Sequence, residues 1–275
     1  MMPIRSLRLF LLLFLLLLLC SGVASSAEVQ PAALKANIRD FVGEDYTYAI
    51  DFLFFDGLAA GELRLTETER PNVFRAELIG RTLGVAAWLT SERTQEYSSL
   101  MELCPDGSMR SLEHTSRILK RKDGEWKDRG KRYRFDYEKS EVIQEKSRDG
   151  VYRPGKVFDI AKNLEPVDIL TAFYNLRMGV YGPLVIGTQL RIPTFSSKGM
   201  SEILIDVLAP ETLDAQGSSP SSGLLLQAKV DPEVFNTGNG ELFFLLNDLG
   251  IPERGIVEDI VGLGDISGYL DEKHM

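Results

Sequence analysis

The chain is poor in the residues that carry most enzyme chemistry. Its 275 residues include two histidines, His114 and His274, and two cysteines, Cys20 and Cys104. A serine or cysteine nucleophile usually needs a positioned base, most often a histidine, and neither histidine accompanies a nucleophile motif. Zinc requires several His/Cys ligands, and no calcium-loop spacing occurs. The sequence therefore predicts no catalytic, cofactor-binding or metal-binding residue.

Two weaker features are given structural interpretations. We interpret His114 as a surface or partly buried strand residue, and Cys104 as a half-buried structural thiol. The 40 acidic residues leave a carboxylate pair for glycoside hydrolysis open, although no motif indicates one.

Long apolar runs are also scarce. Leu9–Leu19 is an apolar run of 11 residues, whereas a transmembrane helix needs roughly 20. It follows Arg5 and Arg8 and precedes small residues, which is the order of a secretory signal peptide. We predict cleavage after Ala27, with Ala24 as the alternative, and hence a periplasmic protein.

A lipoprotein anchor at Cys20 is the competing interpretation. Leu19 argues against it, because the residue before a lipoprotein cysteine is small. After cleavage Cys104 would be alone, so no internal disulfide is expected. The sequence contains no Asn-x-Ser/Thr sequon, which gives no support to a glycosylated secreted protein.

The charge is unevenly distributed. Removal of Arg5 and Arg8 leaves 29 basic and 40 acidic residues, a net charge of −11, which disfavours a nucleic-acid partner. Residues 117–134 instead hold nine Lys/Arg and three Asp/Glu, a net of +6. We predict a long basic hairpin with Trp126 near its tip.

Two interpretations of this basic hairpin stay open. It is a solvated edge that resists aggregation, or it contacts anionic lipid or glycan head groups at a membrane surface, or an envelope protein. The candidate contact residues flank the predicted Asp123-Gly124 turn and are Lys120, Arg121, Lys122, Lys127 and Arg129.

Strict alternation of apolar and polar residues predicts strands with one buried face. It begins at Tyr46 and recurs through Tyr137, and further strands are predicted at 185–195, 203–208, 224–230, 241–247 and 266–270. Asp-Gly pairs at 56–57, 106–107, 123–124 and 149–150 predict hairpin turns. Pro166 as first helical residue, Asp168 in the first turn and Gly179 as a cap predict a helix of about three turns.

These patterns predict three parts of the chain. Residues 1–27 form the signal peptide, 28–43 a leader that is partly helical, and 44–275 a single β-rich domain with a long exposed loop at 209–223. Gly262–Gly268 lacks the glycine spacing of a phosphate loop, so a strand with tight turns is the better interpretation.

Several segments resemble the bacterial family called domain of unknown function 3108. These are "EDYTYAIDFLFFDGLAAGELRL", "RTLGVAAWLTSERTQEY", "EPVDILTAFYNLR" and "LFFLLNDLGIPERGI". The resemblance runs from about residue 44 to 270 and implies an exported protein built mostly of antiparallel strands. It implies no reaction and no catalytic residues.

The expected fold class is mainly β: a curved antiparallel sheet or open barrel with one α-helix, which the resemblance implies to be lipocalin-like or lipoprotein-carrier-like. Our leading hypothesis is a non-enzymatic periplasmic protein that binds a lipid-like or amphipathic ligand in an apolar concavity. The candidate ligand contacts are the aromatic residues Phe52, Phe54, Phe55 and Trp88, for which plain core packing is the alternative. An envelope assembly factor that acts through protein contacts is the second hypothesis, and an enzyme of unrecognised type is the third.

Overall fold

The structure is a computed structural model that describes residues 36–52, 55–84, 87, 92–209, 223–234, 239–260 and 264–274. The predicted signal peptide and most of the predicted loop at 209–223 lie outside these ranges. None of the described helices is long and apolar enough to cross a membrane.

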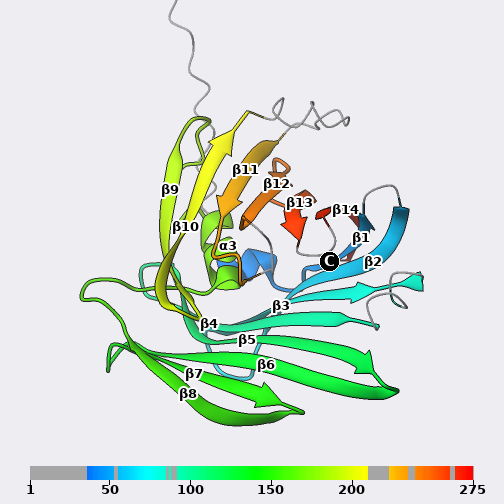
Figure 1. The fold of residues 1–275 in the computed structure, drawn as a ribbon. Helices are drawn as coiled ribbons and strands as arrows, with labels where there is room; N and C mark the ends of the chain where they lie inside the picture. The colour runs from blue at the N-terminus through cyan, green and yellow to red at the C-terminus, as the bar shows by residue number, and fades with distance from the viewer. Residues whose placement is uncertain are drawn as a thin grey trace, which may run out of the picture. The chain divides into compact units, whose positions relative to one another are not determined.

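The alternating segments form one antiparallel sheet of 14 strands (Figure 1). Its order is β8-β7-β6-β5-β4-β3-β2-β1-β14-β13-β12-β11-β10-β9. The edge strands β8 and β9 do not pair, so the sheet is unclosed. The expected mainly β fold class is therefore confirmed. The strands are β1 (Asp45–Phe52), β2 (Phe55–Glu67), β3 (Val73–Thr82), β4 (Thr94–Leu103), β5 (Met109–Lys122), β6 (Glu125–Asp136), β7 (Glu141–Arg148), β8 (Val151–Asp159), β9 (Gln189–Ser196), β10 (Gly199–Leu208), β11 (Leu224–Lys229), β12 (Glu241–Leu246), β13 (Pro252–Ile260) and β14 (Gly264–His274).

Three of the four predicted Asp-Gly turns are confirmed. Asp123-Gly124 and Asp149-Gly150 join paired strands with positive φ at both residues, between 53° and 80°, as a two-residue type I′ turn requires. The pair at 106–107 links β4 to β5. The pair at 56–57 was wrongly predicted as a turn. Phe52 already pairs with Phe55, so the chain reverses earlier and Asp56-Gly57 lies within β2.

Helix α3 (Ile169–Arg177) confirms the predicted helix but begins later than expected. Pro166 is not its first residue. Asp168 is the N-cap, because its side chain accepts hydrogen bonds from the backbone N–H groups of Leu170 and Thr171, which satisfies donors that the first turn leaves free. Gly179 follows the helix with a φ of +74°, as a C-terminal cap does.

The sheet curls around α3, and we call the face against which α3 packs the inner face (Figure 1). Ala172 and Leu176 pack into a cluster with β9–β12, whereas Leu170 and Tyr174 pack into another with β2–β5. The leader joins the second cluster through the short 3-10 helix η1 (Ile38–Phe41), whose Ile38 and Phe41 are buried. One helix thus packs against two parts of the same sheet.

The edge strands meet through side chains rather than backbone hydrogen bonds. Phe158 of β8 contacts Phe195 of β9 with ring centroids 5.1 Å apart. Tyr133 and Phe135 of β6 contact the same Phe195 ring at 6.2 and 6.5 Å. We call this aromatic contact the seam.

Candidate functional site

An apolar cavity of about 290 Å³ lies between α3 and the inner face of the sheet. Its walls combine residues far apart in the sequence, because the sheet curls back on the helix. Helix α3 contributes Phe173 and Leu176, and facing strands contribute Ile50, Ile205 and Phe244 among others. Apart from Tyr48 and Arg254, its lining residues are apolar or glycine. We call this space the apolar cavity.

Glycines form part of the cavity wall. Gly255 of β13 and Gly268 of β14 stand directly opposite one another, and Gly61 lies in β2. A glycine within a strand costs roughly 0.5–1 kcal/mol of stability and often marks a place that a ligand approaches closely. A Cβ added at Gly255 or Gly268 would meet no atom closer than 3.9 Å. Packing therefore does not exclude side chains at these two positions, and the glycines leave the space open.

A second, larger space of about 530 Å³ opens next to the seam. Tyr97, His114 and Tyr133 line it from β4, β5 and β6, together with four cations, Arg93, Arg129, Lys131 and Lys146. Thr194 and Ser196 of β9 contribute hydroxyl groups. We call this space the polar cleft. Ile169 and Ile203 line both the polar cleft and the apolar cavity, so the two spaces adjoin there.

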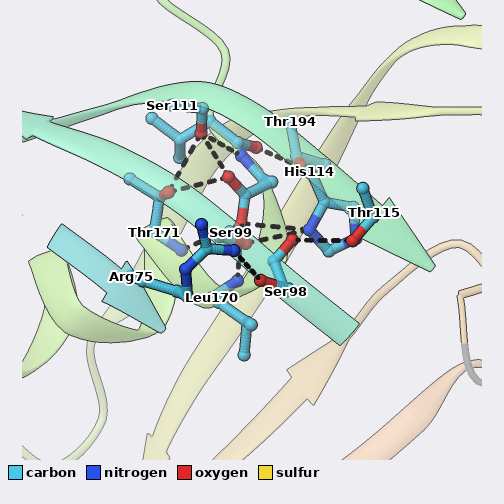
Figure 2. A network of polar contacts seen from close by, with 11 residues as sticks. Arg75, Ser98, Ser99, Ser111, His114, Thr115, Leu170, Thr171 and Thr194 are labelled. Carbon is cyan, nitrogen blue, oxygen red and sulfur yellow. Dashed lines mark hydrogen bonds and ion pairs between the residues drawn. The ribbon is translucent and has the colours of Figure 1, made fainter. Parts of the chain in front are cut away.

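A buried hydrogen-bond network connects the polar cleft to the start of α3 (Figure 2). Ser99 and Ser111 donate to the two carboxylate oxygens of Asp168 at 2.6 Å each, and the Thr171 hydroxyl donates to Oδ2 at 2.7 Å. With the backbone donors of Leu170 and Thr171, the buried carboxylate is fully satisfied, as a buried charge must be. The network therefore fixes the N-terminus of α3 against β4 and β5.

His114 completes this network from β5. Its Nδ1 lies 2.9 Å from the Ser99 hydroxyl. Ser99 has one proton and donates it to Asp168, so Nδ1 of His114 is the donor in this contact. Burial lowers the pKa of His114 below its ordinary value, and the charge of Asp168 opposes that shift. The predicted strand position of His114 is confirmed, but the side chain is buried, more deeply than the surface or partly buried position that we predicted.

This Ser-His-Asp group does not have the geometry of a catalytic triad. In a triad, histidine stands between serine and aspartate and takes the serine proton. Here Ser99 stands between His114 and Asp168 and gives its proton directly to the carboxylate. Ser99 is also fully buried, so no substrate reaches its hydroxyl group. The arrangement serves to hold the helix.

A buried ion pair holds the other end of α3. Arg177 donates to both oxygens of Glu44 at 2.7 and 2.8 Å, and its guanidinium lies 4.1 Å from the centre of the Phe41 ring. The Tyr46 hydroxyl donates to Glu44 at 2.7 Å. Burial alone would lower the pKa of Arg177, but the hydrogen bonds with Glu44 raise it above its ordinary value. The helix that covers the apolar cavity is thus fixed at both ends.

The structure does not test the four aromatic residues predicted as ligand contacts. Phe54 and Trp88 lie outside the described residues, and only the backbone of Phe52 and Phe55 is described. The backbone of Phe52 lies opposite Ile266, which is part of the cavity wall. The sequence alone did not predict the aliphatic residues that line the apolar cavity, such as Ile50, Leu176 and Ile205. The one available signal of this wall was Gly268 inside the strand predicted at 266–270.

The basic hairpin forms as predicted, from β5 and β6, with Trp126 exposed next to its turn. Arg121 pairs with Glu92, and Lys127 pairs with Glu125. Lys120 is exposed, the side chain of Lys122 lies outside the described residues, and Arg129 lines the polar cleft. The structure therefore places the five predicted contact residues on one hairpin but does not bring them to one site.

Comparison with known proteins gives little beyond this description. No family model matches the sequence, and no curated protein matches it. Among solved structures, the chain is similar to the crystal structure of a beta-barrel-like protein of domain of unknown function DUF1849 from Brucella abortus. The two are 12% identical, with a TM-score of 0.47 over 85% of this chain and 97% of the other.

Proposed function

We propose that this protein is a non-enzymatic binding or carrier protein of the bacterial envelope, and that the apolar cavity holds the apolar part of a lipid-like ligand. The observation that supports this most is the cavity of about 290 Å³ between α3 and glycine-bearing strands. Ligand pockets are usually mostly apolar spaces of about 300–1,000 Å³, so this cavity is at the lower end of the range.

The cavity also bears on the choice between the hypotheses raised by the sequence. An envelope assembly factor that acts through protein contacts needs no internal space, and a filled core with an exposed apolar patch would favour it. An enzyme needs reactive groups that substrate can reach, and the buried Ser99 is not one. The cavity therefore supports the binding protein over the assembly factor.

Export to the periplasm, signal cleavage after Ala27 and the resemblance to the domain of unknown function 3108 family remain predictions from the sequence. Native mass spectrometry on protein extracted gently from the source bacterium tests the location and the ligand together. We expect the mass of a chain beginning at Glu28 and a second species that carries a bound lipid. A chain that begins at Met1, or an acylated Cys20, would contradict the predicted location.

Filling the cavity tests its role directly. The double variant Gly255→Val/Gly268→Val places two side chains in the cavity, where added Cβ atoms find room. Gly80→Val is the matched control. Gly80 stands opposite Gly61 on β3, also has room for a Cβ, and is not part of the cavity wall. The double variant should lose the lipid-bound species while the control keeps it.

A folding defect would not explain that loss, because valine favours strands more than glycine does. We therefore expect a melting temperature of the double variant at or above that of the wild type. If the double variant melts normally and still carries the lipid, the ligand lies elsewhere and the proposal fails.

A further inference from the structure

The register of the sheet sets like charges directly against one another on its inner face. Arg129 of β6 stands opposite Arg148 of β7, and Lys131 stands opposite Lys146, which in turn stands opposite Arg153 of β8. Residues directly opposite in an antiparallel pair share a face, and like charges in such positions are destabilising. Three neighbouring strands therefore carry an unfavourable row of cations. We call these five residues the inner cations.

Four of the five inner cations lack a counter-ion among the described residues. Across the part of the chain that the structure describes, Arg129, Lys146, Arg148 and Arg153 form no ion pair, and Lys131 has one contact of 3.6 Å, with Glu233. The opposite face of the same strands is different. There Arg117 pairs with Asp128 at 2.7 Å, and Arg132 pairs with Glu145 at 2.7 Å. Ion pairs thus neutralise the cations on the outer face of these strands, whereas most cations on the inner face have no ion-pair partner among the described residues.

Three of the inner cations line the polar cleft, namely Arg129, Lys131 and Lys146, and Arg93, which precedes β4, also lines it. Three carboxylates also line the cleft, but each has its own donors. Asp168 is fully hydrogen-bonded by the network at α3. Asp231 accepts from the backbone N–H of Glu233, and Glu233 accepts from Ser197 and pairs with Lys198 at 3.5 Å and with Lys131 at 3.6 Å. The cations are thus the groups left without strong partners.

We propose that the ligand is a single-chain amphiphile with an anionic head. Its head lies in the polar cleft against Arg129, Lys131 and Lys146, and its chain passes Ile169 and Ile203 into the apolar cavity. This inference rests on the proposed function and adds the charge and the placement of the head. A carboxylate or phosphate head receives charge-assisted hydrogen bonds there and relieves the repulsion between the opposed cations.

The size of the cavity indicates one chain rather than two. A volume of about 290 Å³ corresponds to about ten water molecules at roughly 30 Å³ each, and a methylene group is of similar size to a water molecule. A chain of moderate length therefore fills the apolar cavity. The head then stays in the polar cleft, on the other side of Ile169 and Ile203 from the chain.

Three detergents with the same dodecyl chain test the inference by isothermal titration calorimetry: dodecyl phosphate, dodecyl maltoside and dodecyltrimethylammonium, each below its micelle concentration. The wild type should bind dodecyl phosphate about tenfold more tightly than dodecyl maltoside, and the cationic detergent most weakly. Inorganic phosphate, added alone as a fourth probe, should bind far more weakly than dodecyl phosphate because it has no chain to bury.

Variants then locate the head. The variant Lys131→Gln/Lys146→Gln should bind dodecyl phosphate about tenfold more weakly than the wild type does. Its affinity for dodecyl maltoside should stay within about twofold of the wild-type value. The control Arg70→Gln/Lys162→Gln removes the same charge from exposed positions outside the cleft and should change neither affinity. The cleft variant should melt close to the wild type, because it removes an opposed pair of like charges together with the half-exposed contact between Lys131 and Glu233.

Each of the other possible outcomes contradicts a specific part of the inference or of the proposed function. If dodecyl phosphate and dodecyl maltoside bind equally to the wild type and to the cleft variant, the head-group inference fails while the apolar cavity keeps its function. If inorganic phosphate binds as tightly as dodecyl phosphate, the polar cleft binds a free anion, and the proposal that the ligand is an amphiphile is wrong. If no dodecyl compound binds at all, the proposed function fails together with the inference.

Discussion

The buried ion pair between Arg177 and Glu44 gives the sharpest test of how α3 is held over the apolar cavity. The side chains are 1% and 9% exposed, and the contact is bidentate. Arg177→Met keeps a long apolar side chain and leaves Glu44 buried with one remaining side-chain donor, Tyr46. Breaking a buried pair by removing one partner costs about 3–5 kcal/mol, because the other charge stays buried and unpaired.

Urea unfolding followed by circular dichroism measures this loss. The free energy of unfolding falls by about 3 kcal/mol per molar urea. The urea concentration at the unfolding midpoint should therefore be roughly 1–1.7 M lower for Arg177→Met than for the wild type. Arg191→Met is the matched control. Arg191 pairs with Glu202 at 3.1 Å, but the two side chains are 63% and 55% exposed. An exposed pair contributes about 0–1 kcal/mol, so this control should shift the midpoint by about 0.3 M at most.

A double-mutant cycle separates the pair from the packing around it. Glu44→Gln alone should also destabilise strongly, because it leaves Arg177 buried without its carboxylate. The double variant Glu44→Gln/Arg177→Met removes both charges and should cost less than the sum of the single changes, with a coupling of about 2–3 kcal/mol. Additive single effects, or a midpoint for Arg177→Met no lower than that of Arg191→Met, would refute the reasoning.

Two further predictions concern His114 and the basic hairpin. Burial lowers the pKa of His114 in the folded state. As the pH falls below about 6.5, the unfolded chain therefore binds more protons than the folded chain does. The free energy of unfolding then decreases by up to about 1.4 kcal/mol per pH unit. Urea unfolding at about pH 7.5, 6 and 5 should show this slope, and His114→Gln should reduce it; an equal slope in both proteins would count against the buried neutral histidine. Replacing Lys120, Arg121, Lys122, Lys127 and Arg129 by Gln should change stability within about 0.5 kcal/mol and reduce cosedimentation with anionic vesicles. Absence of any salt-sensitive vesicle binding by the wild type would leave the hairpin as a solubilising edge.

The amino-acid sequence by itself predicted the features that depend on neighbouring residues. Alternation identified most strands because side chains on a strand point to opposite faces in turn. Asp123-Gly124 and Asp149-Gly150 marked their hairpins because glycine accepts positive φ without strain. The spacing between Asp168 and Gly179 located α3, although the cap proved to be Asp168 and the helix began three residues after Pro166.

Other features were decided by the tertiary structure. Strand β13 was missed, because Pro252 and the charged residues after it do not alternate as an isolated strand would. Glu44 and Arg177 are 133 residues apart, and no local pattern joins them. The apolar cavity draws its wall from α3 and from strands at both ends of the chain, so it exists only once the sheet has curled around the helix.

The distribution of charge shows the same division most clearly. Composition alone located the basic segment 117–134 and its net charge of +6. Which of its cations are neutralised depends on register, because a shift of one residue moves every side chain to the other face. The register pairs Arg132 with Glu145 on one face and opposes Lys131 to Lys146 on the other. The sequence determined how much charge the hairpin carries, and the pairing of its strands decided where that charge is left without a partner.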